Sequence, residues 1–427
     1  MIDPAASHTI SFDNLKLKRF FIVEERVEAG TTCRFRDALS LGSTQQWIGP
    51  RPALDTQEGR HAALSMFIPP YVAQVPMRIG TRPGGADDLQ FWQYPAITEQ
   101  LAWERHAALP LRQQPLPGNA PVETYVGQPW ATYIDKGKEP TLLKPVLKTR
   151  LSGYRALAEH WGFVWGEDVR VHTVCQHIYW QRLLPLWQEL GITDLHLSHC
   201  EPASSAAAAA HGLRVHSWPL AAANVVNSDR QTGWTPGRPL AHRSLLASFI
   251  GAHMPHYRSE VRLALAQEVA KHSDLPLLFS LGDNWHFNEL VYDFQVAGKP
   301  RTDQVAASEA AAASHYNAML SDSVFSLCPE GAGPNTLRLW ESLATGSIPV
   351  VIVEDWLPPL VPPGAPAWEE AVIWVQRHEV AGLLTRLDAL LREQPEKLQR
   401  MQKAAMALYE AFQAKLCFGT SPLTAPL

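Results

Sequence analysis

The sequence predicts an α/β protein made of two doubly wound parallel sheets, preceded by an N-terminal region that the sequence does not explain. From residue 122 to 218, segments typical of strands and helices alternate, as they do in a parallel sheet flanked by helices. After a glycine- and proline-rich stretch at 227–243, the alternation begins again. Within 321–353, a strand, a glycine loop, a short helix and a second strand follow one another.

These patterns divide the chain into four parts. Residues 1–120 form an N-terminal extension of unclear structure, in which moderately periodic pieces such as 98–108 are candidate helices. Residues 121–240 and 241–412 are two Rossmann-like domains, and residues 413–427 are a tail.

Individual elements follow from residue type and from turn signals. In the first domain, 123–134 is rich in β-forming residues and ends at a turn, although Pro129 indicates that this strand is broken or starts late. The other strands are expected at 169–178, 192–198 and 213–218, and the helices at 148–161, 180–190 and 203–210. In the second domain, strands are expected at 244–250, 277–280, 324–327, 348–353 and within 368–375, and helices at 256–270, 304–320, 379–391 and 395–412.

The loop 329–334 is a candidate phosphate site. Gly331 and Gly333 permit backbone angles that other residues avoid, and Asn335 or Thr336 begins the helix that follows. The N-terminus of that helix presents free N–H groups and a partial positive charge, which favour a phosphate.

Arg338 and Glu341 are neighbours on one stripe of this helix. An arginine in the first turn can contact two phosphate oxygens, and a glutamate one turn later can accept hydrogen bonds from a ribose diol. An Arg-x-x-Glu pair is more often a solvated ion pair, so the surrounding sequence must decide between the two interpretations.

That surrounding sequence resembles a known family. The segments Ser323–Pro329, Arg338–Leu343 and Gly346–Val351, together with Gly331, are similar to the donor-site signature of the exostosin family, glycosyltransferase family 47. The resemblance covers 244–412 well and 122–226 in outline. It implies the two-domain GT-B fold, in which a cleft holds a nucleotide sugar against the second domain and a glycan or glycolipid acceptor against the first.

The resemblance also implies the chemistry. Family members are expected to invert the configuration of the sugar without a metal ion, so the loop amides near Gly331 and Arg338 would stabilise the leaving diphosphate. Arg258 and Arg262 correspond to a place that faces the donor diphosphate in relatives, although both could simply be solvated. Glu330 departs from the family, because an acid beside a diphosphate is unfavourable unless it points away.

An inverting reaction needs a general base, for which the sequence offers three candidates. Asp135 follows a predicted strand, and His177 and His199 lie near the ends of the next two strands. Asp135 and His177 are the leading candidates. Each has a structural alternative, since Asp135 could start a turn and either histidine could be an ordinary hydrogen-bonded residue.

Composition narrows the class of protein and its compartment. The net charge of −5 gives no reason to expect nucleic acid, and the five cysteines contain no Cys-x-x-Cys pair, which favours a reducing compartment. The N-terminus lacks the features of a signal peptide, and no segment is apolar enough to cross a membrane. We therefore expect a soluble, bacterial, cytoplasmic enzyme, with peripheral association with the inner membrane as an option. The family resemblance further implies a role in surface polysaccharide synthesis.

No cofactor is expected beyond the nucleotide-sugar substrate. The 17 histidines include spaced pairs such as His253 and His256, but no convergent carboxylate or cysteine set accompanies them, so no metal site is predicted. Two alternatives to a transferase stay open: a catalytically silent carbohydrate- or nucleotide-binding protein, and a sugar-nucleotide hydrolase. Trp285 and Trp356, on loops beside predicted strand ends, are candidates for stacking on a sugar.

Overall fold

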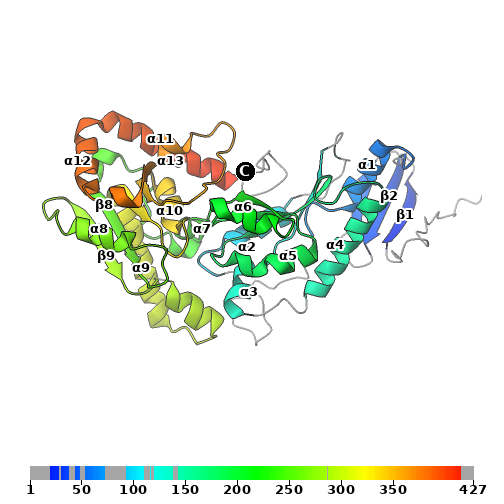
Figure 1. Ribbon diagram of the computed structural model, residues 1–427, viewed down its shortest axis with the longest axis horizontal. Coiled ribbons are helices and arrows are strands. Elements are labelled where there is room, and N and C mark those ends of the chain that lie inside the picture. The colour runs from blue at the N-terminus through cyan, green and yellow to red at the C-terminus, as the bar shows by residue number, and fades with distance from the viewer. Residues whose placement is uncertain are drawn as a thin grey trace, which may run out of the picture.

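The chain forms two lobes side by side, with a small separate sheet at the outer end of the first (Figure 1). The computed structural model describes residues 20–27, 30–37, 44–48, 53–72, 93–109, 116, 120–137, 143–285 and 287–414. The first lobe is the part built on strands between residues 122 and 217, and the second lobe is the part built on strands between 245 and 375.

The first lobe contains a four-stranded parallel sheet in the order β4-β5-β6-β7. Its strands are nearly or wholly buried, which explains why their sequences show little alternation of polar and apolar residues. The strands are β4 (Val122–Tyr125), β5 (Val169–Cys175), β6 (Asp194–Leu197) and β7 (Arg214–Ser217). The helices of this lobe are α1 (Gln57–Phe67), α2 (Thr98–Ala107), α3 (Trp130–Lys136), α4 (Leu143–His160), α5 (Leu184–Leu190) and α6 (Pro202–Ala209).

The second lobe contains a five-stranded parallel sheet in the order β12-β11-β10-β8-β9. Every residue of the central strand β10 is buried. The strands are β8 (Leu245–Ala252), β9 (Leu277–Gly282), β10 (Ser323–Pro329), β11 (Ile348–Ile352) and β12 (Ile373–Val375). The helices are α8 (Val261–Val269), α9 (Asp303–Asp322), α10 (Leu337–Thr345), α11 (Trp368–Ala371), α12 (Leu383–Glu393) and α13 (Pro395–Ala414). The predicted pair of parallel α/β sheets is confirmed.

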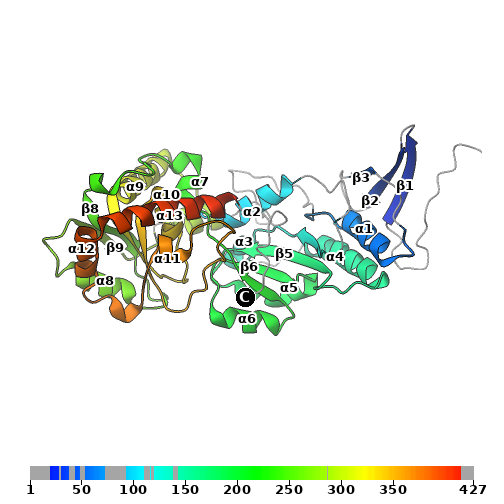
Figure 2. The same cartoon turned by 90° about the horizontal axis from the view of Figure 1, so that it is seen from above.

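Helix α13 packs along α10 and α11, and its far end reaches the first lobe (Figure 2). There the Arg105 guanidinium donates a hydrogen bond to the backbone carbonyl of Gln413. The C-terminal helix therefore braces the helix that carries the predicted phosphate site, and it also ties the two lobes together.

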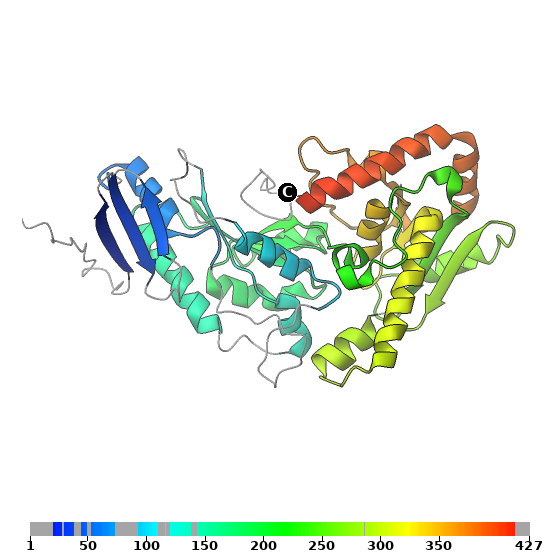
Figure 3. The ribbon, with the colours of Figure 1, turned by 180° about the vertical axis from the view of Figure 1, so that it is seen from behind.

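Short elements connect these parts. The crossing between the lobes contains α7 (Ala223–Val226) and two 3₁₀ turns, Ser228–Arg230 and Leu240–His242. A π-helix, Glu289–Val296, follows β9 and contacts α3 of the first lobe. At the outer end of the first lobe, β1 (Phe20–Val27), β2 (Gly30–Asp37) and β3 (Thr44–Ile48) form an antiparallel sheet (Figure 3). The sequence patterns predicted neither this sheet nor the π-helix.

Several predicted element boundaries differ from the structure, among them the helix expected at 148–161, which begins at Leu143. The strand expected at 123–134 ends at Tyr125, and 130–136 is helix α3, because buried Glu99 accepts hydrogen bonds from the N–H of Ala131 at the start of that helix. The helix expected from 256 begins at Val261, so Arg258 lies in the loop before it. The helix expected from 379 begins at Leu383, after Gly382 with φ of 71°.

Candidate donor pocket between the lobes

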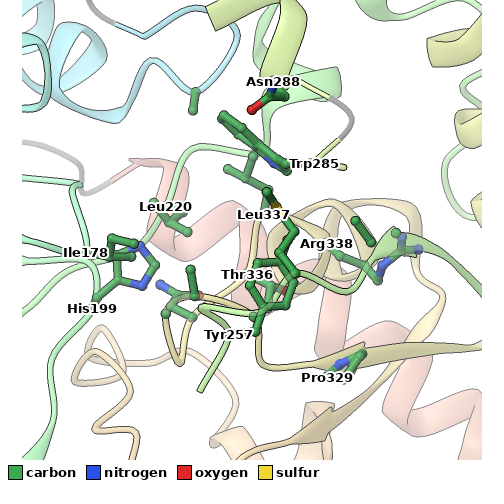
Figure 4. A pocket seen from close by; sticks show the side chains of 18 of the residues that line it. Ile178, His199, Leu220, Tyr257, Trp285, Asn288, Pro329, Thr336, Leu337 and Arg338 are labelled. Atoms are coloured by element: carbon green, nitrogen blue, oxygen red, sulfur yellow. The ribbon is translucent and has the colours of Figure 1, made fainter. Parts of the chain in front are cut away.

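A cavity of ≈ 490 Å³ lies between the lobes and is lined by residues of both. This volume is within the roughly 300–1,000 Å³ that is usual for small-molecule sites. The first lobe contributes the segment 176–179 and His199, and the second contributes the ends of β8 and β10 and the start of α10. Figure 4 shows His199 and Ile178 facing Thr336, Leu337 and Arg338 across it. We call this cavity the donor pocket.

The N-terminus of α10 opens onto the donor pocket. Thr336 is the N-cap, and its hydroxyl accepts a hydrogen bond of 3.3 Å from the N–H of Leu339. The first N–H groups of a helix have no acceptor within the helix, and Leu337 and Arg338, which follow the cap, both line the pocket. The geometry therefore places backbone donors and the positive end of a helix dipole at one wall of the cavity.

Arg338 adds a full charge at the same wall. Its side chain is 8% exposed, and one terminal nitrogen donates to the carbonyl of Ile250. The other terminal nitrogen, Nη1, is buried and has no hydrogen-bond partner among the described residues. The guanidinium carbon lies 4.8 Å from the ring centroid of Phe249 and 4.9 Å from that of Tyr316. A buried cationic donor without an acceptor is costly, so this group is arranged for an anionic ligand.

Glu341 lies one turn further along α10 and also lines the pocket. One carboxylate oxygen accepts a hydrogen bond of 3.0 Å from the N–H of Asn224, and the other accepts one of 2.7 Å from the Tyr316 hydroxyl. Burial raises the pKa of this carboxyl, although these bonds and Arg338 oppose the shift. Each carboxylate oxygen has a further lone pair, so Glu341 can still accept a bond from a ligand hydroxyl.

Asn335 lines the pocket, but its side chain is used within the protein. The amide nitrogen donates to the carbonyl of Ser198 in the first lobe at 2.9 Å, and the amide oxygen accepts from the Trp340 indole at 2.9 Å. The structure therefore places this side chain in the contact between the lobes, and only its backbone is left to face a donor.

Gly331 and Gly333 both line the pocket, but the reason for glycine differs from the one that the sequence suggested. Neither is among the glycines with positive φ, so space is the constraint. A Cβ at Gly333 would lie 2.3 Å from Nδ1 of His199 and 2.9 Å from the side chain of Ile178, whereas one at Gly331 would lie 2.8 Å from the tip of Arg262. Gly333 thus lets the loop touch the first lobe.

Arg262 positions the edge of the sheet. It donates to the carbonyls of Ala252, Glu330 and Pro329 at 2.6, 2.9 and 3.2 Å, so it holds the ends of β8 and β10 together. It also lines the pocket, and burial lowers its pKa to about 10. Three of the five N–H groups of Arg262 donate to backbone carbonyls, so Arg262 supports the loop and still has donors for a ligand.

Arg258 lies outside the pocket lining, where it forms ion pairs with Glu201 of the first lobe and Glu330 of the second. Glu330 is 1% exposed and also accepts bonds of 2.5 Å from Ser259 and from Arg377. It is likewise absent from the pocket lining. The unusual acid after Cys328-Pro329 therefore points away from the pocket and is neutralised by two arginines.

On the first lobe, Asp135 and His177 form a dyad. The imidazole Nε2 lies 2.9 Å from a carboxylate oxygen of Asp135, while Nδ1 accepts a hydrogen bond of 3.0 Å from the N–H of Tyr179. Because Nδ1 accepts, the proton of the neutral ring is assigned to Nε2, which donates to Asp135. Gln93 donates to the other oxygen of Asp135. His177 lines the pocket and Asp135 lies behind it.

His199, the third candidate base, is poorly suited to that role. Burial lowers its pKa to about 3, so the neutral ring is a weak base. Its Nδ1 has no hydrogen-bond partner among the described residues, but that edge of the ring is packed against Gly333. His199 therefore acts here as a packing surface for the loop.

The two candidate tryptophans have different surroundings. Trp285 lines the pocket, whereas Trp356 is 7% exposed and belongs to an apolar cluster with Trp340 and Trp368. The pocket also contains residues that no sequence pattern singled out, namely Gln93, Tyr257, Tyr316 and Tyr292. They come from separate segments without a motif, and only the fold reveals them.

Neither a metal-binding cluster nor a membrane-spanning helix is found among the described residues. No cluster of three or more histidine, cysteine or acidic side chains among these residues is arranged to hold a metal ion. No helix in this part of the chain has the length and apolar character needed to span a bilayer.

Comparison with known proteins identifies the domain. Residues 210–390 match the Exostosin GT47 domain family. Two proteins of Oryza sativa subsp. japonica, both named probable glucuronosyltransferase, are 36% identical over 104 residues and 33% identical over 108 residues. The matches cover 23% and 24% of this chain, and they span only about a quarter of the relatives, 24% and 25% of their lengths.

Solved structures with detectable similarity are distant. Anabaena HepE in complex with UDP-glucose is 11% identical, with 81% of this chain and 96% of that chain covered and a TM-score of 0.34. The α,α-trehalose-phosphate synthase of Burkholderia vietnamiensis is 12% identical, with 75% and 74% covered and a TM-score of 0.34. The fold assignment therefore depends on this chain's own architecture.

That architecture consists of two doubly wound parallel sheets with a shared pocket between them, which is the GT-B arrangement. The match of residues 210–390 covers β8, β10 and α10, which build the second-lobe wall of the pocket. The expected resemblance to the exostosin family, glycosyltransferase family 47, is thus confirmed for residues 210–390.

Proposed function

We propose that this protein transfers a sugar from a nucleoside diphosphate sugar, bound in the donor pocket, to a glycan or glycolipid acceptor. The observation that carries the proposal is the buried Nη1 of Arg338, which has no hydrogen-bond partner among the described residues at the wall where α10 begins. The match of residues 210–390 to the Exostosin GT47 domain supports the same reaction class.

The donor would bind with its diphosphate at this wall. The N–H groups of Leu337 and Arg338 and the Arg338 guanidinium would contact phosphate oxygens, and the free lone pairs of Glu341 would accept from the ribose. As the sugar leaves, charge develops on the diphosphate, and donors that are already oriented stabilise this charge without reorganisation. These groups supply charge that a divalent cation supplies in other transferases, so we propose a metal-independent reaction and expect turnover to persist in a chelator.

We propose that transfer inverts the anomeric centre and that the His177–Asp135 dyad supplies the base. An acceptor hydroxyl would replace the Tyr179 N–H as the partner of His177 Nδ1 and transfer its proton there. Asp135, on Nε2, holds the ring and stabilises the imidazolium that forms.

The acceptor that we propose belongs to a surface polysaccharide or its lipid-linked precursor, and the compartment that we propose is the cytoplasm, including the inner face of the membrane. Three buried cysteines, Cys175, Cys200 and Cys328, are free thiols, which suits a reducing compartment. Cell fractionation of the tagged protein tests this placement.

Release of nucleoside diphosphate tests the reaction itself. The purified chain would be incubated with UDP-glucose, UDP-glucuronic acid, UDP-N-acetylglucosamine and the corresponding GDP-sugars, each with and without an oligosaccharide mixture as acceptor. Acceptor-dependent release with a new glycosidic product supports the proposal. Equal release without any acceptor identifies a hydrolase, and binding without release identifies a silent binding protein.

A further inference from the structure

The donor pocket changes character between its inner wall and its mouth. At the inner wall, Arg338 and Glu341 are 8% and 3% exposed. Tyr179 and Tyr292 line the same cavity but are 43% and 40% exposed. Among the described residues, four large hydrophobic side chains are strongly exposed, and these tyrosines are two of them. Exposed aromatic rings concentrated at one cavity indicate a binding surface.

The two tyrosines come from opposite lobes and are held in place by neighbours. Tyr179 follows β5 in the first lobe, and the Arg182 guanidinium lies 4.6 Å from its ring centroid. Tyr292 is on the π-helix of the second lobe, with its ring centroid 6.4 Å from that of Trp285. The rings are oriented by these contacts while large parts of their surfaces stay open.

Hydrogen-bonding groups of the dyad lie beside these rings. The ring centroids of Tyr179 and His177 are 5.6 Å apart. Tyr292 lies on the π-helix, which contacts α3, the helix that carries Asp135. Burial raises the pKa of Tyr292 to about 12, and the Asp135 carboxylate adds to the shift. Open aromatic surface next to a carboxylate and an imidazole suits a pyranose ring, which has one apolar C–H face and a periphery of hydroxyls.

The exposure of the two tyrosine rings favours a glycan acceptor over the nucleotide-sugar donor as the ligand at this position. A nucleotide sugar has to be shielded from water, as the inner wall is, whereas a glycan chain must extend into solvent beyond the residue that reacts. We infer that Tyr179 and Tyr292 form an acceptor subsite, in which their rings stack on a terminal pyranose of the acceptor glycan and place one of its hydroxyls at His177. This inference rests on the proposed function and adds the class and position of its second substrate.

Sugar binding can be measured without knowledge of the natural acceptor. The full-length protein, saturated with UDP, would be titrated with trisaccharides of glucose, galactose, xylose and mannose, and binding would be followed by saturation-transfer difference NMR. Tyr179→Ala and Tyr292→Ala should each weaken the best trisaccharide at least about tenfold, which corresponds to roughly 1.4 kcal/mol of lost stacking. The Tyr→Phe variants should recover most of this affinity because they keep the ring.

The controls separate stacking from unfolding and from loss of donor. Leu360→Ala removes another exposed apolar side chain, 43% exposed and outside the pocket lining, and should not change trisaccharide affinity. The UDP dissociation constant, measured by calorimetry, should stay within about twofold of wild type in both alanine variants. Thermal melting of each variant confirms that it is folded.

The outcomes are distinguishable from those of the function test. Trisaccharide affinity that is unchanged in the double alanine variant, or absent from the wild type up to about 10 mM, overturns the acceptor subsite. Transfer with an unchanged acceptor KM in both variants overturns the subsite and leaves the transferase intact. Loss of trisaccharide binding in the alanine variants, without transfer from any donor, supports the subsite and contradicts the proposed reaction.

Discussion

The two lobes build their halves of the pocket in different ways. In the second lobe, the wall of the pocket around the start of α10 comes from the short stretch between Pro329 and Glu341, in which a strand end, a loop and a helix N-terminus follow one another directly. The first lobe assembles its half from Gln93, His177 and His199, with Asp135 behind them on α3. The wall that we propose for the diphosphate is therefore encoded locally, whereas the wall that we propose for the acceptor depends on tertiary structure.

The lobes also differ in what their sheets bury. In the first lobe, His172, His196 and Asp194 are each at most 1% exposed. The His172 Nδ1 and His196 Nε2 atoms lie 3.1 Å apart, and Asp194 accepts two hydrogen bonds from Arg214. In the second lobe, the central strand β10 buries apolar and hydroxyl-bearing side chains, with no titratable group other than Cys328. Strands β5 and β6 of the first lobe should therefore respond to acid more strongly than β10 of the second.

The largest effect is expected from a substitution that tests whether the first lobe supplies the catalytic base. Asp135→Asn should lower kcat about a thousandfold, within the range for loss of a positioned base, because the neutral amide cannot stabilise a protonated His177. The UDP dissociation constant should stay unchanged, since Asp135 lies behind the pocket wall. Steady-state kinetics and calorimetry measure both quantities. A fall in kcat of less than about fivefold would remove the dyad from catalysis.

Arg338→Ala tests the second lobe as the nucleotide half. Loss of the buried guanidinium should weaken UDP binding about a hundredfold, since charge-assisted hydrogen bonds to a buried group contribute roughly 1.5–3 kcal/mol. Arg338→Lys should recover part of the affinity, because lysine keeps the positive charge but lacks the planar guanidinium that can contact two phosphate oxygens. Arg155→Ala, at an exposed pair with Glu159, is the control and should bind UDP normally. UDP binding by Arg338→Ala within about threefold of wild type would contradict this site map.

Gly333→Ala tests whether the lobes must touch. The new Cβ would lie 2.3 Å from His199 Nδ1, so the lobes have to separate and kcat/KM should fall about tenfold, roughly 1.4 kcal/mol. Gly331→Ala meets the flexible tip of Arg262 and should have a smaller effect. Combining Gly333→Ala with His199→Ala should restore activity, because removal of the imidazole makes room for the new Cβ. If kcat/KM does not recover in this double variant, separation of the lobes is not the cause of the lost activity.

The last prediction concerns the pH dependence of stability. Burial lowers the pKa of His172 to about 3 and also lowers that of His196, whereas unfolded histidine titrates near pH 6.5. Between about pH 6.5 and 3 the unfolded state binds more protons, so the free energy of unfolding falls as pH decreases, by up to about 1.4 kcal/mol per pH unit for each histidine. Burial raises the pKa of Glu99 to about 8, which opposes part of this loss between about pH 4.3 and 8.

Hydrogen exchange measured at several pH values, after correction for the intrinsic rates, checks this prediction. Protection of β5 and β6 should decrease on acidification before that of β10 and β11 does. His172→Gln should reduce the slope in the first lobe, and His315→Gln, on α9 of the second lobe, is the matched control. Equal loss of protection in both lobes would contradict the prediction that the core of the first lobe is more sensitive to acid.

Sequence patterns predicted the two parallel sheets and placed the start of helix α10 at Asn335 or Thr336, the second of which is the observed N-cap, because a strand, a glycine loop and an N-cap are local signals. They could not predict that Asn335 would bond to Ser198, or that Arg262 would bind three carbonyls, because these contacts join distant segments. The start of α3 was missed because its N–H groups are capped by Glu99, which is 32 residues away from Ala131. Tyr179 and Tyr292 gave no signal at all, since isolated aromatic residues are usually core.

The arrangement around Arg258 bears on how quickly spent nucleotide leaves. Its partners Glu201 and Glu330 belong to different lobes, so opening the protein breaks the first ion pair and keeps the second. Arg258 and Glu201 are partly open to water, with side-chain exposures of 23% and 25%, and dissolved ions therefore weaken their attraction. Ionic strength would thus set the rate at which the lobes part, and turnover would quicken with salt wherever departure of the product limits it.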